Sequence, residues 1–199
     1  MFVLAKFQDV VKINPSLYKN DLQSSIIDLL NKKLANKVIL NVGLCIVLFD
    51  LLNVGDSFIF PGEGGHHTKI EYRFVVFRPF MNELITGKIK GCNEEGIQVT
   101  LSFFDDIQIP ASCLQHPSRF DEEEQVWIWE YEIESEKHSL YMDIGQKIKF
   151  RVVSESFMET SPDIKTTESK SVPENKVPYL LIGSINEPGL GVLEWWTGK

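Results

Sequence analysis

The chain has 199 residues, of which 43% are hydrophobic and 24% charged, values typical of one or two small globular domains with cores of their own. Its net charge of −8 at pH 7 argues against a free-standing protein that binds nucleic acid tightly. The negative charge is concentrated in the second half. Residues 1–80 hold nine basic and seven acidic side chains, whereas residues 81–199 hold 11 basic and 21 acidic ones.

Cysteine usage and hydropathy indicate the cellular compartment of the protein and whether it associates with a membrane. Three widely spaced cysteines predict neither a disulfide framework nor a zinc site, and Cys45 lies in an apolar run that favours a buried thiol. This usage is typical of a reducing compartment, the cytosol or the nucleus. The first residues, MFVLAKFQDVVKI, lack the features of a signal peptide. Residues 38–52 are apolar but, at about 15 residues, too short to span a bilayer, so no membrane association is expected.

The first half is predicted to begin with a strand and a helix. Residues 2–13 form the strand. Asn14 can cap a helix and Pro15 fits its first position, because the first N–H groups of a helix have no partner within it. The helix is predicted to end near Asn36, a residue that tolerates left-handed backbone. Its apolar stripe, at i, i+4, i+7, i+8 and i+12, consists of Leu22, Ile26, Leu29, Leu30 and Leu34.

Two apolar strands are predicted to follow the helix. Residues 38–49 form a nearly continuous apolar run, which is typical of a strand covered on both faces. Residues 51–57 are predicted to turn through Asn53 and Gly55, and residues 68–77 to return as a strand. The first half is therefore predicted to be an α+β domain, with one helix on a small antiparallel sheet.

A glycine-rich loop precedes the last of these strands, and it comprises Pro61, Gly62, Glu63, Gly64 and Gly65, followed by His66 and His67. Closely spaced glycines resist ordering unless something outside holds them, so we expect a protruding tip that docks into a partner. An ordinary surface loop is the alternative. A phosphate-binding loop is disfavoured because no GK[ST] motif and no helix follow. Metal ligation is disfavoured because adjacent histidines on a strand point to opposite faces and lack partner ligands.

The second half is predicted to contain only strands. A hairpin is indicated where two alternating segments flank the turn Asn93-Glu94-Glu95-Gly96. The predicted strands cover residues 84–90, 97–103, 107–110, 126–133, 147–153 and 179–185. Strands of this number and length suit a small closed all-β barrel of the OB-fold type. Residues 154–177 are rich in Ser, Thr, Pro, Glu and Lys, and are predicted to be a disordered insertion.

A basic stripe is the candidate nucleic-acid surface of this half. Lys147, Lys149 and Arg151 alternate with apolar residues, and together with Lys88 and Lys90 they form the largest positive surface expected there. An ordinary solvated strand face is the alternative, because three charges are few.

An aromatic stripe lies on the strand at residues 126–133, where Trp127, Trp129 and Tyr131 share one face. These rings could stack on bases. A core or interface position is favoured, because such large rings usually bury their area.

No catalytic motif is found, and no enzyme active site, metal or cofactor is expected. The enzymatic alternative is a hydrolase that uses Asp105 and Asp106, or the carboxylates of residues 122–124. A hydrolase of this kind would need a cleft that raises the pKa of one carboxyl group. Strands with one face in solvent do not favour such a cleft. Residues 122–124 are expected to be a solvated loop, because the spacing of a calcium site is missing.

Several stretches resemble a known family: NKKLANKVILNVGLCIVLFD (31–50), FPGEGGHHTK (60–69), FVVFRPF (74–80), GKIKGCNEEGIQVTLSFFDDIQIP (87–110), QVWIWEYE (125–132) and LIGSINEPGLGVLEWW (181–196). By these motifs the chain resembles the stalk subunits of nuclear RNA polymerase III, which have a counterpart in the stalk of archaeal RNA polymerase. The resemblance covers nearly the whole chain apart from residues 154–177.

This resemblance implies an N-terminal tip domain, residues 1–80, that docks to the polymerase III core through residues 61–65. It implies an S1-type OB barrel over residues 81–199. It also implies a non-catalytic subunit that forms a heterodimer with a smaller helical subunit. The expected place is the nucleus, beside the RNA exit path, with a role in transcription initiation.

One position departs from the S1 pattern, in which RNA-binding barrels carry aromatic and His side chains on one face. Gln98 stands where an aromatic residue is common. Stacking contributes about 1–3 kcal/mol per base, so its loss predicts weak, salt-sensitive binding of nascent single-stranded RNA. The expected contacts are Lys88, Lys90, Gln98, Lys147, Lys149 and Arg151. The alternative function is a free-standing S1-type RNA-binding factor, which would be stable and bind RNA by itself.

Overall fold

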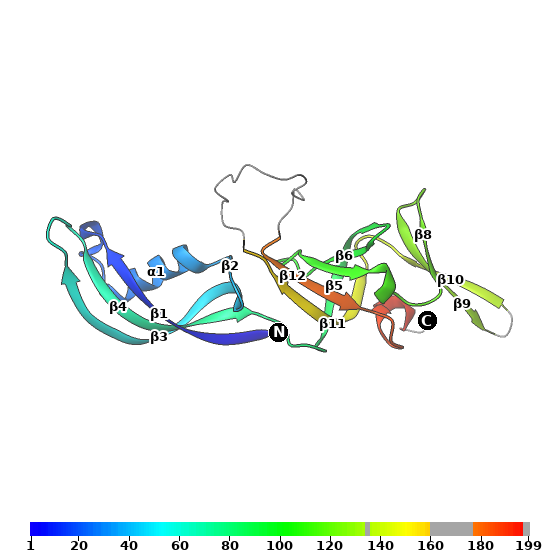
Figure 1. Cartoon of the computed structure of the whole chain (residues 1–199), viewed down its shortest axis with the longest axis horizontal. Coiled ribbons are helices and arrows are strands. Elements are labelled where there is room, and N and C mark those ends of the chain that lie inside the picture. Colours follow the sequence, from blue (N-terminus) through cyan, green and yellow to red (C-terminus); the bar gives the residue numbers. More distant parts are fainter. Residues whose placement is uncertain (134–135, 160–176, 197–199) are drawn as a thin grey trace, which may run out of the picture. The chain divides into compact units, whose positions relative to one another are not determined.

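The computed structural model describes residues 1–133, 136–159 and 177–196 (Figure 1). The chain divides into two compact units, Met1–Pro79 and Phe80–Lys199. Each unit has its own sheet and its own buried apolar residues.

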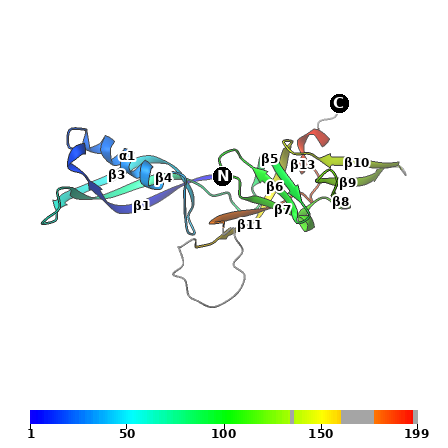
Figure 2. The same cartoon turned by 90° about the horizontal axis from the view of Figure 1, so that it is seen from above.

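The first unit is a four-stranded antiparallel sheet with one α-helix. Its strands are β1 (Phe2–Ile13), β2 (Lys37–Ile39), β3 (Gly43–Ile59) and β4 (His66–Phe77), in the spatial order β1-β4-β3-β2. Helix α1 (Leu22–Leu34) covers one face of the sheet (Figures 1 and 2). There Ile26 and Leu30 are fully buried in one cluster with Phe74. The predicted α+β fold is confirmed, as are the strands predicted at residues 2–13 and 68–77.

The predicted start of the helix is wrong. Asn14 and Pro15 begin only a short 3-10 helix, η1 (Pro15–Leu17), and the Asn14 side chain makes no capping hydrogen bond. The residues that follow carry the chain from the end of β1 onto the sheet face. The N-cap of α1 is Asp21, whose carboxylate accepts a hydrogen bond from the Ser24 N–H at 3.1 Å. The helix ends at Leu34, and Asn36 has the left-handed backbone predicted for it, with φ of 59°.

The strand predicted at residues 38–49 is two strands. The chain reverses between β2 and β3, where Asn41 has φ of 59° and Gly43 has φ of 128°. The turn predicted at residues 51–57 is also wrong, because β3 continues to Ile59. The register of β3 against β4 shifts at four places, so that residues 44–59 of β3 lie along the 12 residues of β4. Such bulges disrupt the two-residue alternation by which a strand is recognised.

The covered face of β3 shows what the bulges do. Its inward side chains are three residues apart rather than two: Cys45, Leu48, Leu51 and Val54. Val47 and Phe49 point away from the core and are exposed, so the residues that the structure describes do not supply the expected cover on both faces. Cys45 is buried as predicted, and burial raises the pKa of its thiol to about 11.

The second unit contains a closed five-stranded barrel, and this confirms the OB-type prediction. The strands are β5 (Leu84–Asn93), β6 (Gly96–Thr100), β7 (Ile107–Pro110), β11 (Lys147–Phe157) and β12 (Tyr179–Ser184). They follow the order β12-β7-β6-β5-β11, and β11 closes the barrel by pairing with β12. The hairpin turn needs Gly96, because it adopts φ of 150° and a Cβ there would lie 2.1 Å from the Ile109 carbonyl oxygen.

One strand that the sequence assigns to the barrel lies elsewhere. β9 (Val126–Ile133) belongs to a three-stranded sheet, between β8 (Ser118–Asp121) and β10 (Glu136–Met142), which were not predicted. The aromatic stripe of β9 packs against the rest of its unit, in agreement with the core position favoured from the sequence. The Trp127 indole N–H donates a hydrogen bond to the Asn93 carbonyl oxygen at 2.9 Å. The Trp129 ring lies 5.3 Å, between centroids, from the Trp195 ring of the last 3-10 helix, η3 (Leu193–Trp195), and is tilted against it by 39°.

The predicted insertion, residues 154–177, lies partly within the residues that the structure describes. β11 runs to Phe157, so the insertion does not begin at residue 154 as predicted. Residues 160–176 lie outside the described residues. The remaining short elements are η2 (Ala111–Cys113) and β13 (Gly191–Val192), which pairs with β11. In the part of the chain that the structure describes, no helix has the length and apolar character to cross a membrane.

The cap of α1 can be tested directly. We expect Asp21→Ala to lower the free energy of unfolding by about 1 kcal/mol, because the Ser24 N–H loses its acceptor. Urea unfolding of the full chain, followed by circular dichroism, measures this. Asn14→Ala is the matched control and should change stability little, because Asn14 makes no capping bond. Equal losses in both variants would contradict the assignment.

Candidate functional site

The end of the β3–β4 hairpin, residues 58–67, is the first candidate surface, and we call it the sheet end. Glu63 ties its loop to two strands, because its carboxylate lies 2.7 Å from Lys12 Nζ on β1 and 2.8 Å from His67 Nε2 on β4. The hydrogen bond from Lys12 first, and then that from His67, lowers the pKa of Glu63 below its usual value.

The glycines of the loop permit close packing against the same unit. Gly65 is buried, and a Cβ on it would lie 2.8 Å from the Ile13 carbonyl oxygen. The Tyr18 hydroxyl donates to the Gly64 carbonyl oxygen at 3.2 Å. The loop is thus ordered by contacts within its own unit, contrary to the expectation that something outside must hold it. Docking through Pro61, Gly62, Glu63, Gly64 and Gly65 stays a prediction.

The most exposed apolar side chains of the sheet end were not among the site residues predicted from the sequence. Ile59 is 62% exposed and Phe60 49% exposed. Phe58 and Phe60 contact each other at 5.1 Å between ring centroids, and Phe60 contacts the His67 ring at 4.9 Å. The sequence does contain a sign of this surface. Phe58, Ile59 and Phe60 are three consecutive apolar residues directly before Pro61, and no polar residue separates them.

The two adjacent histidines make separate contacts. His66 packs on the Tyr18 ring at 5.0 Å between centroids, whereas His67 binds Glu63. Among the residues that the structure describes, no three His, Cys, Asp or Glu side chains are placed to hold a metal ion.

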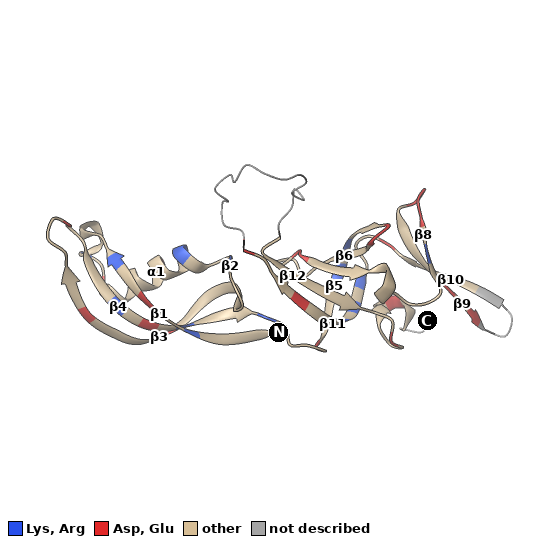
Figure 3. Cartoon of the chain, in the orientation of Figure 1, with Lys and Arg blue, Asp and Glu red and all other residues tan. Residues whose placement is uncertain are grey.

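The barrel brings three of the predicted cations together. Lys88 on β5 lies directly opposite Lys147 on β11, and Lys149 is the next residue on the same face of β11. Figure 3 shows the distribution of basic and acidic residues over these strands. None of the three makes an ion pair with another described residue. Like charges directly opposite one another destabilise a sheet, so this trio favours a bound anion.

The other two cations are already paired. Lys90 Nζ lies 2.9 Å from Asp105, and Arg151 Nη2 lies 2.7 Å from Glu187. Arg151 also donates to the Asn82 carbonyl oxygen at 3.1 Å. A phosphate would have to compete with these carboxylates, so both residues are weaker candidates than the trio.

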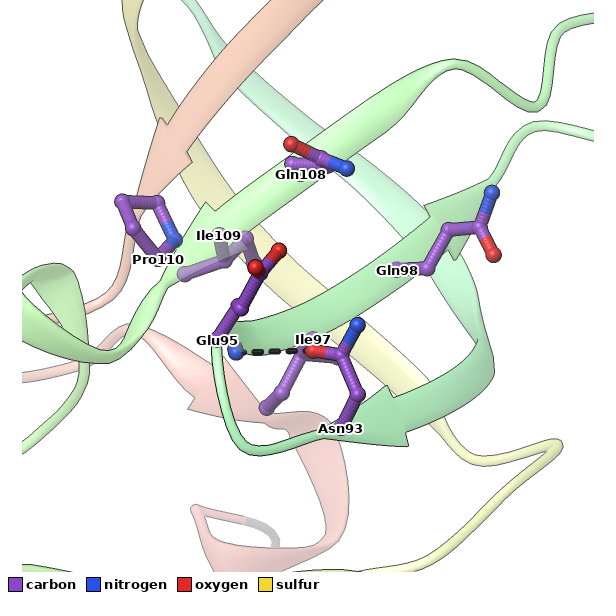
Figure 4. A pocket seen from close by; sticks show the side chains of 8 residues that line it. Asn93, Glu95, Ile97, Gln98, Gln108, Ile109 and Pro110 are labelled. Atoms are coloured by element: carbon purple, nitrogen blue, oxygen red, sulfur yellow. Dashed lines mark hydrogen bonds between the residues drawn. The ribbon is translucent and has the colours of Figure 1, made fainter. Parts of the chain in front are cut away.

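Gln98 lies on a different part of the barrel. It stands opposite Gln108 in the β6–β7 pair, beside a pocket of about 240 Å³ (Figure 4). The described residues that line this pocket include amides, a carboxylate and aliphatic groups but no aromatic ring: Asn93, Glu95, Gly96, Ile97, Gln98, Gln108, Ile109 and Pro110. The pocket therefore offers hydrogen bonds to a ligand rather than a stacking surface.

Asp105 and Asp106, the carboxylates of the hydrolase alternative, lie in the loop between β6 and β7. Thr100 donates to one oxygen of Asp105 and Lys90 to the other, which lowers the pKa of Asp105. Burial, and then the charge of Asp105, raises the pKa of Asp106. With both oxygens engaged, Asp105 holds its loop in place and is poorly suited to act as a base.

The fold defines a class of protein in which an α+β sheet unit precedes an OB-type barrel. Residues 83–196 match the family model described as RNA polymerase III subunit Rpc25, and residues 8–64 match the SHS2 domain found in the N terminus of Rpb7p/Rpc25p/MJ0397. The chain belongs to the RNA polymerase III subunit Rpc25 family, which confirms the resemblance stated from its motifs.

Individual relatives agree along their whole length. The chain is 54% identical to DNA-directed RNA polymerase III subunit RPC8 of Bos taurus, with 100% of both chains covered. It is 41% identical to subunit rpc8 of Schizosaccharomyces pombe, over 98% of this chain and 100% of the relative. An archaeal relative, subunit Rpo7 of Sulfolobus acidocaldarius, is 20% identical over 98% of this chain and 94% of its own.

The contact between Lys12 and Glu63 predicts a pH dependence. We expect Glu63 to titrate below its ordinary value of 4.5, and Lys12→Met to raise its pKa toward that value. The contact therefore stabilises the loop above pH 4.5, and this contribution is lost as the pH falls through the lowered pKa. Carbon-13 NMR titration of the carboxyl groups measures it. Lys69→Met, which removes an exposed lysine of β4, is the control. An unchanged Glu63 pKa in Lys12→Met would contradict the assignment.

Proposed function

We propose that this chain is the non-catalytic stalk subunit of nuclear RNA polymerase III, docked to the core by its first unit and acting in transcription initiation. The observation that carries the proposal is the exposed apolar sheet end in a chain of the Rpc25 family. A soluble protein rarely leaves such side chains grouped on its surface unless a partner covers them. A location in the nucleus follows from the same family membership.

Docking through the sheet end rests on Phe58, Ile59 and Phe60. Side chains of this kind favour binding when a partner removes them from water. Glu63 and the loop glycines act indirectly, because they hold the loop against β1 and so fix where these side chains point. A preformed surface loses little conformational entropy on binding, which favours affinity.

The open face of the sheet, opposite α1, is proposed to bind the smaller helical subunit. Leu4, Val75 and Val47 stand side by side across β1, β4 and β3 on this face. Phe49 is 57% exposed, and the Arg73 guanidinium lies 5.2 Å from its ring centroid. A helix with an apolar stripe can cover such a row, much as α1 covers the other face.

RNA binding is proposed as a weak, secondary role of the barrel. Lys88, Lys147 and Lys149 contact phosphates, with lesser contributions from Lys90 and Arg151 and a polar contact at Gln98. Few charges, and a glutamine at position 98 where an aromatic ring is common, predict weak binding with little sequence preference. Transcript emerging beside a stalk is held at high effective concentration, so weak contacts suffice.

The docking proposal is tested with Phe60→Asp. We expect the tagged variant to bind the polymerase III core roughly 30-fold more weakly, because a charge replaces an apolar anchor worth about 2 kcal/mol or more. Co-purification of the core from cell extract, measured over a bait titration, reports this. Ile144→Asp is the matched control, since Ile144 is a similarly exposed apolar residue of the other unit. Undiminished core binding by Phe60→Asp would contradict the proposal.

The same purification separates the two partner surfaces. Phe60→Asp should retain the smaller helical subunit, whereas Phe49→Asp should lose that subunit first. Loss of both partners with either variant would show that the sheet end and the open face are not independent sites.

The RNA proposal is tested by changing Lys88, Lys147 and Lys149 to Ala. We expect weaker binding of single-stranded RNA and a salt slope flatter by about 2, because each lost phosphate contact contributes roughly 0.7. Fluorescence anisotropy with the co-expressed heterodimer, at several salt concentrations, measures both. The control changes Lys19, Lys32 and Lys37 in the first unit, which removes equal charge. An unchanged slope in the barrel variant would place the RNA site elsewhere.

A further inference from the structure

A row of aromatic rings runs along one face of the three-stranded sheet of the second unit and continues onto η3 and the residue after it. The Trp129 ring on β9 lies 5.3 Å from the Trp195 ring and 6.5 Å from the Trp196 ring, between centroids. In the other direction Trp129 lies 5.1 Å from Tyr131, and Tyr131 stacks on His138 of β10 at 5.3 Å. We call these five residues the aromatic row.

The aromatic row is exposed at both of its ends. Trp196 is 45% exposed, and His138 at the other end is also exposed, whereas Trp129 between them is half-buried. The Trp196 indole N–H donates to the Leu190 carbonyl oxygen at 3.1 Å, so this ring is held in place before any ligand arrives. A large exposed ring with a fixed orientation loses little conformational entropy when a ligand stacks on it.

The Trp195 ring places the aromatic row beside the lysines of β11. Lys149 pairs with Gly191 of β13, and residues that pair across antiparallel strands point to the same face. A Cβ on Gly191 would lie 2.7 Å from the Trp195 ring, so the glycine lets this ring pack on the strand next to Lys149. The row therefore adjoins the face of β11 that also carries Lys147, which is exposed.

The carboxylates of β9 lie on the other face of the same sheet. Glu130 and Glu132 alternate with the rings of this strand, and Glu130 is paired with Arg119 of β8 at 2.8 Å. Glu194 lies in η3 and is exposed, so it repels a phosphate that approaches there. An anionic ligand is therefore expected to reach the rings from the side of Lys149.

The combination of rings and cations selects the kind of ligand. Lys88, Lys147 and Lys149 repel one another, and a phosphate backbone relieves this repulsion. A protein partner of an aromatic row has no need of such a cluster of like charges. Single strands of nucleic acid are bound in this way, with the backbone on basic residues and the bases stacked on aromatic rings. Duplex RNA is disfavoured, because its bases are already stacked inside the helix.

We propose that single-stranded RNA crosses this surface with phosphates on Lys88, Lys147 and Lys149 and with bases stacked on the aromatic row, first on Trp196. The inference rests on the RNA contact proposed for the three lysines and adds the place where the bases bind. Stacking tolerates every base, because each has a π face, so this site gives affinity for single strands without sequence preference.

The test compares two probes of equal charge with the co-expressed heterodimer: a strand of about 12 adenosine nucleotides, and a backbone of the same length that carries no bases. We expect fluorescence anisotropy to show the adenosine strand binding about fivefold more tightly or better, because stacking adds to the phosphate contacts. Trp196→Ala should remove most of this preference and leave binding of the baseless backbone unchanged. Trp196→Phe keeps a ring and should retain the preference.

Tyr141→Ala is the matched control. Tyr141 is 44% exposed on β10, but it alternates with Leu140 and Met142 and so lies on the face of the sheet opposite the aromatic row. This variant should keep the preference for the adenosine strand. Quenching of tryptophan fluorescence by the adenosine strand, but not by the baseless backbone, gives a second readout and should weaken in Trp196→Ala.

The outcomes separate this inference from the proposed RNA role. Equal binding of the two probes by the unaltered chain would overturn the inference, as would an unchanged preference in Trp196→Ala. If both probes weaken when the three lysines become Ala but no preference for bases exists, the phosphate contacts stand and the stacking site is wrong. If the preference exists but the lysine variant binds the baseless backbone normally, stacking stands and the phosphate contacts are wrong. Loss of a polymerase subunit from purified Trp196→Ala, with its base preference intact, would assign the row to a protein partner and overturn the inference.

Discussion

The pairing of β3 with β4 along almost their whole length is the constraint on which the first unit depends. β4 is the central partner of both β1 and β3, and its pairs run from Phe77 to His66. The bulges let β3 follow β4 over this distance while it keeps inward side chains three residues apart. Bulges also increase local twist, which lets a short helix cover the middle of the covered face.

This constraint also explains why apolar side chains remain exposed. One helix of 13 residues covers one face, so among the described residues the side chains of the open face and of the sheet end stay exposed. Removing such apolar area from water stabilises a complex by roughly 25 cal/mol per Å². The first unit is thus built with two separate apolar surfaces that a polymerase subunit can use for assembly.

In the second unit, closure of the barrel determines which charged residues lie next to one another. β5 and β11 are far apart in sequence, and their pairing sets Lys88 opposite Lys147 in a half of the chain that is otherwise acidic. The surrounding carboxylates keep Lys90 and Arg151 occupied. The cations that remain without a described ion-pair partner are few, so the RNA contact proposed above would be auxiliary.

The sequence alone determined the α+β unit, the barrel class, the glycine-rich turn and the family, because alternation, helical spacing and turn residues are local properties. It could not determine that Asp21 rather than Asn14 caps α1, since both residues are suitable caps and only the path onto the sheet decides between them. Nor could it locate β3, whose bulges disrupt the alternation. The partners of Lys90 and Arg151 were decided by tertiary structure, because each depends on a residue that only folding brings within hydrogen-bonding distance.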